Sequence, residues 1–128
     1  MAKQDALKNE LDGLRNALPE LRGVLLASVD GLPIAHALSG DIDPNRTAAI
    51  ASAAGGLGKR ICQHLGSGEF GEFHMRGEDA VLLVYAAGSK ASLVVIGAPN
   101  VNIGLLHLEA RNVANSIRNI LEDSAKAA

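Results

Sequence analysis

The stretch that decides the fold runs from Asp43 to Leu65 and reads DPNRTAAIASAAGGLGKRICQHL. Its first two residues predict a helix start, because an aspartate can cap free amide groups and Pro44 fits the first helical position. Three glycines then fall in the middle of the expected helix: Gly55, Gly56 and Gly58. Each costs about 0.5–1 kcal/mol relative to alanine, so the helix is expected to have a close neighbour on its glycine side.

At about 100° per residue, this helix has an aliphatic side and a small-residue side. We expect the aliphatic side to pack on a sheet: Ile50, Ala53, Ala54, Leu57, Ile61 and Leu65. The opposite side lacks most of the strong helix formers of a solvated face, which predicts a contact with a second copy of the chain. Its residues are Ala48, Ala51, Ser52, Gly55, Gly56, Lys59 and Cys62. The alternative is a helix enclosed within one protomer.

The segments before this helix predict a helix and a hairpin. Leucines spaced for one helical face indicate an amphipathic helix over residues 1–18, ended by Pro19. Asp30-Gly31 between two apolar runs is typical of a β-hairpin, and Pro33 confines the second strand to an edge or to its own first positions.

The segments after it predict three strands, over residues 69–76, 80–86 and 91–97, and a last helix capped by Asn100 or Asn102. Residues 122–128 are expected to form a disordered tail. The order α-ββ-α-βββ-α over residues 1–128 predicts a single domain, an α+β three-layer sandwich around a five-stranded antiparallel sheet.

The strand at 69–76 reads as a sheet edge. Polar residues occupy alternate positions, with Glu72 and His74 among them, and Phe70 stands before them. An edge strand can pair with its symmetry mate, so Phe70, Glu72 and His74 join the predicted dimer interface.

Composition excludes several classes of function. A net charge of −2 and only three aromatic residues (Phe70, Phe73 and Tyr85) argue against nucleic-acid binding. The apolar runs are too short to insert in a membrane, and the single Cys62 fits a reducing, cytoplasmic setting.

The patterns that resemble catalytic motifs fail their tests. Residues 66–71 match GxGxxG but follow a helix and precede a strand, the reverse of a dinucleotide site. Gly58-Lys59 is followed by Arg60, where a phosphate-binding loop needs Ser or Thr. The four histidines are dispersed, one to each expected element, and are expected to be solvated: His36, His64, His74 and His107. The sequence therefore predicts no catalytic, cofactor or metal site, although a site assembled in three dimensions stays open.

Several segments together resemble the roadblock/dynein light chain family. Residues 23–35, GVLLASVDGLPIA, are similar to its first hairpin, and residues 47–61, TAAIASAAGGLGKRI, to its second helix. Residues 80–85, 91–96 and 102–106 are similar to its central strands and the start of its last helix. The resemblance extends over residues 5–121, nearly the whole chain.

The resemblance implies one helix on one face of the sheet and two on the other, and homodimers built from the central helix and third strand. Bacterial members regulate Ras-like small GTPases, so it implies a non-catalytic regulator of such a GTPase. Arg46, Lys59 and Arg60 are candidate contacts, because basic side chains suit an acidic partner surface. The alternative is a profilin-like domain that senses a small molecule or signal and has no GTPase partner. A stronger form of the GTPase hypothesis is an arginine finger, for which the sequence offers no rigid loop.

Overall fold

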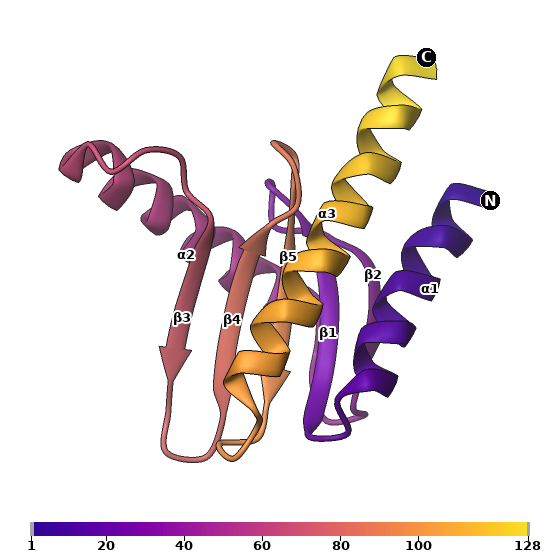
Figure 1. The fold of residues 1–128 in the computed structure, drawn as a ribbon, viewed down its shortest axis with the longest axis vertical. Coiled ribbons are helices and arrows are strands. Elements are labelled where there is room, and N and C mark those ends of the chain that lie inside the picture. The colour runs from indigo at the N-terminus through magenta and orange to yellow at the C-terminus, as the bar shows by residue number, and fades with distance from the viewer. Residues whose placement is uncertain (1, 128) are drawn as a thin grey trace.

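The computed structural model describes residues 2–127, which form one five-stranded sheet between two layers of helices (Figure 1). In chain order the elements are α1 (Ala2–Ala17), β1 (Leu21–Ser28), β2 (Pro33–Leu38), α2 (Pro44–Leu65), β3 (Glu72–Arg76), β4 (Val81–Ala86), β5 (Ala91–Gly97) and α3 (Ile103–Ala127). The strand order is β2-β1-β5-β4-β3, and every neighbouring pair is antiparallel. The predicted element order and fold class are confirmed.

Local sequence explains the turns and helix ends. Gly31 takes a φ of +87° in the β1–β2 turn, where the Ser28 amide donates to the Leu32 carbonyl at 2.8 Å. Asp43 caps α2 by accepting from the Asn45 amide at 3.1 Å, and Gly66 ends the helix with a φ of +62°. Asn102 caps α3 by accepting from the Leu105 amide at 3.1 Å.

The core is divided by the sheet. On one face, α1 and α3 pack their aliphatic side chains against the strands, with Leu11, Leu106 and Ile117 fully buried. On the other face, α2 covers a smaller cluster in which Ala48 and Ala51 meet Val84 of the sheet. The predicted division of helices between the two faces is therefore present.

Two boundaries differ from the predictions. Strand β3 begins at Glu72 and leaves Phe70 in the preceding loop, because the register with β4 starts at Glu72. The Gly71 carbonyl accepts one further hydrogen bond, from the Ala86 amide at 2.9 Å. Helix α3 continues to Ala127 and so includes most of the segment 122–128 expected as a tail, which contains no glycine or proline; residue 128 lies outside the described residues. Among the described residues, no helix is both long and apolar enough to cross a bilayer.

Helix α2 extends beyond the edge of the sheet that it covers. In Figure 1 its C-terminal half projects past β3, the last strand of the sheet, and the chain returns through residues 66–71 to start that strand. The projecting helix and the edge strand below it frame the candidate site.

Candidate interaction surface and side-chain cluster

The side of α2 that faces the sheet is made of small residues: Thr47, Ala48, Ala51, Gly55 and Gly58. A Cβ placed on Gly58 would lie 2.3 Å from Cε1 of Phe70, and one on Gly55 would lie 3.7 Å from the Ser92 hydroxyl oxygen. Gly55 and Gly58 therefore do have the close neighbour that the helix-propensity cost of glycine predicted. That neighbour belongs to the same protomer.

The predicted orientation of α2 is therefore wrong. The aliphatic side was expected on the sheet and the small side outward, yet Ala48, Ala51 and Gly55 are buried against the sheet within the protomer. Small side chains let a helix backbone approach the strands closely, and this close approach has decided the orientation. The aliphatic side lies about a quarter-turn further around the helix.

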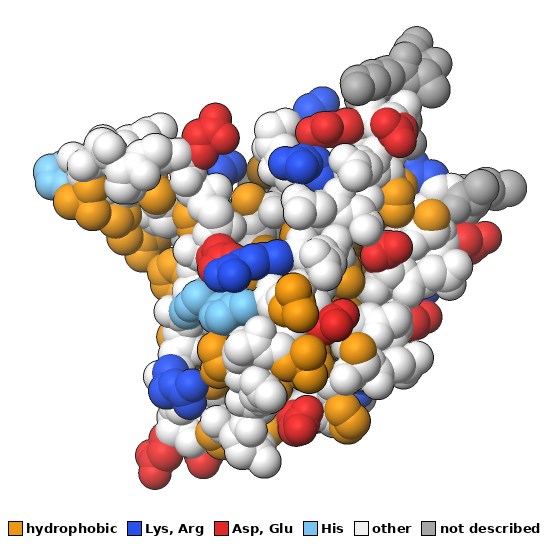
Figure 2. Space-filling model, in the orientation of Figure 1, with side chains coloured by type: hydrophobic (Ala, Val, Ile, Leu, Met, Phe, Trp, Pro, Cys, Tyr) orange, Lys and Arg blue, Asp and Glu red, His pale blue; other side chains and the backbone are white. Residues whose placement is uncertain are grey.

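The aliphatic side of α2 is exposed instead. Its four large residues have 46–68% of their surface accessible: Ile50, Leu57, Ile61 and Leu65. Figure 2 shows apolar side chains along the lower side of the projecting part of α2, next to the edge of the sheet. Met75 of β3 is also 45% exposed. We call these five residues the α2–β3 surface.

The remaining residues predicted for the dimer interface have different surroundings. Ser52 donates to the Val29 carbonyl at 2.7 Å, Gly56 and Lys59 are exposed, and Cys62 is half-buried. Phe70 packs on Gly58 inside the protomer. None of these placements by itself tests whether the residue contacts a second copy.

Glu72 and His74 point to the opposite face of the sheet, where they meet residues of α3. The Arg111 guanidinium donates to both oxygens of Glu72, with Nη2 2.9 Å from Oε1, and His74 Nε2 lies 3.2 Å from the same Oε1. The His107 ring stacks on His74 with centroids 4.6 Å apart, and its Nδ1 is 2.8 Å from the Tyr85 hydroxyl. We call these five residues the β3–α3 cluster.

Electrostatics within the β3–α3 cluster follow from these contacts. The hydrogen bond from Arg111 lowers the pKa of Glu72 and raises the pKa of Arg111 itself. Burial, and then the neighbouring His74, lower the pKa of His107. Burial raises the pKa of Tyr85, so its hydroxyl stays protonated. The cluster thus links an edge strand to α3 through an ion pair and a stacked imidazole pair.

The expectation that the four histidines lie apart is wrong for His74 and His107, which stack on each other, although His74 is exposed as expected. Their sequence separation hides the contact, because it depends on α3 crossing the sheet next to β3. Two local signals were available. Glu72 and His74 alternate on one strand face, and His107 and Arg111 lie four residues apart on one helix face.

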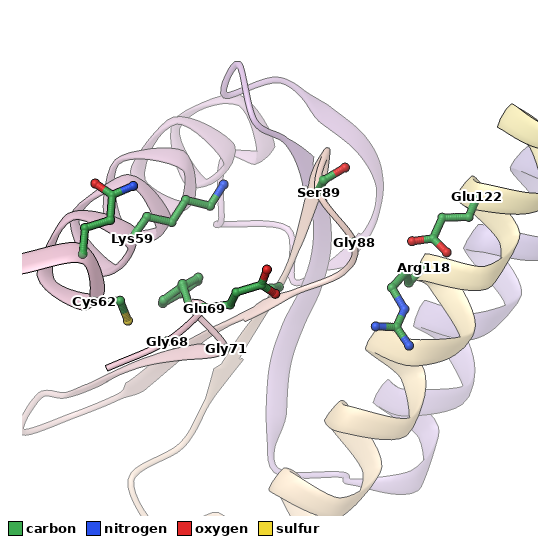
Figure 3. Close-up of a pocket in the computed structure, with 12 residues that line it drawn as sticks. Lys59, Cys62, Gly68, Glu69, Gly71, Gly88, Ser89, Arg118 and Glu122 are labelled. Atoms are coloured by element: carbon green, nitrogen blue, oxygen red, sulfur yellow. The ribbon is translucent and has the colours of Figure 1, made fainter. Parts of the chain in front are cut away.

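The three basic residues predicted to contact a partner are all exposed on α2: Arg46, Lys59 and Arg60. Lys59 lines a groove of about 660 Å³ between the C-terminal half of α2 and α3 (Figure 3). Arg118 and Glu122 line the groove from α3, and Glu69 lines it from the loop that joins α2 to β3. These four charged side chains are exposed and balanced in sign, which suits a polar contact surface better than an enclosed ligand site.

Comparison with known proteins fits this architecture. The family model described as "Roadblock/LC7 domain" matches residues 7–97, from α1 to the end of β5. The chain belongs to the Roadblock/LC7 domain family. Its roadblock domain is similar to the uncharacterized protein MJ0310 of Methanocaldococcus jannaschii, with 32% identity over 103 residues, 80% of this chain and 90% of that protein.

Solved structures share the fold. A Roadblock/LC7 domain from Streptomyces avermitilis superposes with a TM-score of 0.82 and 25% identity, over 90% of this chain and 97% of that one. MglB of Myxococcus xanthus superposes with a TM-score of 0.87 and 21% identity, over 94% of this chain and 90% of that one. The fold implied by the sequence resemblance to the roadblock/dynein light chain family is thus confirmed.

Proposed function

We propose that this roadblock domain is a non-catalytic, homodimeric regulator or scaffold that binds a Ras-like small GTPase and modulates its activity or its location. One observation carries the proposal: four large aliphatic side chains are exposed on α2, the helix whose C-terminal half projects past the edge strand β3. Apolar patches of this kind on small domains mark interaction sites. The family to which the chain belongs supports the choice of partner.

The α2–β3 surface suits a two-fold contact. Within residues 2–127, strand β3 pairs only with β4, so the backbone groups on its outer side are available to a second β3. Pairing about a two-fold axis would bring the projecting parts of both α2 helices together above the joined sheets. Leu57 and Ile61 would then pack against their counterparts. This arrangement keeps the dimer interface predicted from α2 and β3 but replaces its small residues by aliphatic ones.

The basic residues of α2 stay available in such a dimer. Arg46 and Arg60 lie on the exposed side away from the sheet, and Lys59 faces the groove shared with α3. Charges at the rim of an interface mainly raise the association rate and select the partner. We propose that they meet an acidic surface of the GTPase.

A sensor of small molecules is the second candidate, and the groove between α2 and α3 is the observation in its favour. Its charged residues are exposed and do not converge on an enclosed volume, so we place this function second. The sensor function would take first place if a small molecule slowed hydrogen exchange in the residues of the groove and no GTPase bound under any condition.

The proposal is tested by retaining purified small GTPases from the same genome on the immobilised protein, each loaded with GDP or a slowly hydrolysed GTP analogue. We expect one GTPase to be retained, and charge reversal at Arg46, Lys59 or Arg60 to weaken its binding about tenfold. Arg22→Glu, an exposed arginine on β1, is the matched control and should bind normally. Retention of none of the GTPases in either nucleotide state would contradict the proposed partner.

A further inference from the structure

The β3–α3 cluster carries a second site that the proposed function does not use. Glu72 and His74 project from alternate positions of β3 onto one face of the sheet, and His107 reaches them from the second turn of α3. One ligand atom from each of the three residues lies within 4.8 Å of the other two. Figure 2 shows the histidines together on an open face of the molecule, next to basic and acidic side chains.

We propose that Glu72, His74 and His107 bind a divalent transition-metal ion, with Zn²⁺ as the best match to the donor set. Two imidazole nitrogens and one carboxylate oxygen are ordinary zinc ligands, and imidazole favours zinc, copper and nickel over magnesium or calcium. Three protein ligands leave one tetrahedral position for water or for a group of a partner.

One ligand–ligand distance already fits this ion, and the other two require His107 to move. With metal–ligand bonds of about 2.0–2.1 Å, the ligand atoms of a tetrahedral site lie roughly 3.3 Å apart. Glu72 Oε1 and His74 Nε2 already have this separation, at 3.2 Å. His107 has to approach them, and its imidazole is half-buried but stacked on the exposed His74 ring, which can turn with it.

The surroundings orient the ligands as metal sites commonly require. A metal-bound histidine generally donates its second ring N–H to a neighbouring acceptor. The Tyr85 hydroxyl oxygen lies 2.8 Å from Nδ1 of His107 and is placed to accept that N–H when Nε2 binds the ion. Tyr85 is only 2% exposed and belongs to β4. Its contact with Nδ1 therefore ties the orientation of the His107 ring to the sheet.

Arg111 competes with the ion for Glu72. Its Nη2 donates to Oε1, the oxygen next to His74, while its Nε donates to Oε2. Binding of a cation at Oε1 replaces the first of these bonds and can keep the second. Since the guanidinium also repels a divalent cation, removal of its charge is expected to strengthen binding.

The test measures Zn²⁺ binding to the full chain in competition with a chromophoric chelator, and Co²⁺ binding by visible absorption. We expect one ion per chain and Co²⁺ bands of a tetrahedral site. His74→Ala, His107→Ala and Glu72→Gln should each weaken Zn²⁺ binding about 10–100-fold, and Arg111→Gln should strengthen it several-fold.

His64→Ala provides the matched control, because His64 is an exposed histidine on α2 and outside the cluster. The circular dichroism of each variant without metal shows that its fold is kept. Equal loss of affinity in His64→Ala, or unchanged affinity in the three ligand variants, would overturn the proposal. This measurement involves no GTPase, so its result is independent of the proposed function.

Discussion

At the scale of single residues, Gly58 and Gly56 lie two positions apart on α2 and have opposite surroundings. A Cβ on Gly58 would overlap the Phe70 ring, at 2.3 Å from Cε1, whereas a Cβ on Gly56 would meet nothing within 4 Å. The helix-propensity gain from alanine is about the same at both positions, roughly 1 kcal/mol. The two substitutions therefore separate packing against Phe70 from backbone propensity.

We predict that Gly56→Ala raises the free energy of unfolding by about 0.5–1 kcal/mol. Gly58→Ala should be about 1–2 kcal/mol less stable than Gly56→Ala, because the added methyl group displaces the aromatic ring. Urea unfolding of both variants and of the wild type measures the difference. Equal stability of the two variants would show that Phe70 moves away from α2 without cost.

The same residues show what the sequence could and could not predict. The cost of the glycines indicated a close neighbour correctly for Gly55 and Gly58 but not for Gly56, which meets nothing within 4 Å. Which neighbour it was depended on how near α2 could come to the sheet. Hydrophobicity favoured Leu57 and Ile61 as the packing side, but residues without large side chains permitted the closer approach.

At the scale of elements, the link between β3 and α3 makes stability depend on pH. Burial and His74 lower the pKa of His107 below its ordinary value of 6.5. The unfolded chain therefore binds a proton at this site more readily than the folded chain, and protonation favours unfolding. Stability from this source is present above about pH 6.5 and is lost as the pH falls through the lower, folded-state pKa.

We predict that the free energy of unfolding falls as the pH is lowered from 7, and that His107→Gln reduces this fall below about pH 6.5. Glutamine can still form a hydrogen bond with the Tyr85 hydroxyl but carries no titratable ring. Urea unfolding in chelator-treated protein measures the effect. Curves of wild type and variant that stay parallel over this range would contradict it.

Glu72 also makes the free energy of unfolding fall with decreasing pH, but at a lower pH than His107. The Arg111 hydrogen bond lowers its pKa from 4.5, so the carboxylate contributes stability above that value, which is lost as the pH falls through the folded-state pKa. The ion pair is partly exposed, so its share is small at physiological salt. Acid is thus expected to loosen β3 from α3 in two steps.

Elements were easier to predict than their contacts. The hairpin at Gly31, the caps of α2 and the cap of α3 are set by residues within a few positions of each other. The cluster of Glu72, His74 and His107 required the crossover that places β5 between β1 and β4 and brings α3 next to the edge strand. The spacing within the strand and within the helix shows which residues share a face, but nothing in the chain indicates that these two faces meet.

At the scale of the whole molecule, the α2–β3 surface should couple assembly to stability. Burial of Leu57 and Ile61 in a dimer stabilises only the folded state, so the melting temperature of the wild type should rise with protein concentration. A tenfold increase in concentration corresponds to roughly 1.4 kcal/mol per mole of dimer, or a rise of about 2–4 °C for a chain of this size.

Leu57→Glu places a charge in the centre of this surface and should yield a monomer by sedimentation, with a melting temperature that no longer depends on concentration. Gln63→Glu is the matched control: it adds the same charge to α2 on the side away from the aliphatic residues, and should leave both properties unchanged. Because Leu57 has no role in the core of the protomer, the variant should keep its circular dichroism. A dimer that persists in Leu57→Glu would place the contact on another surface, and a monomeric wild type at high concentration would exclude it altogether.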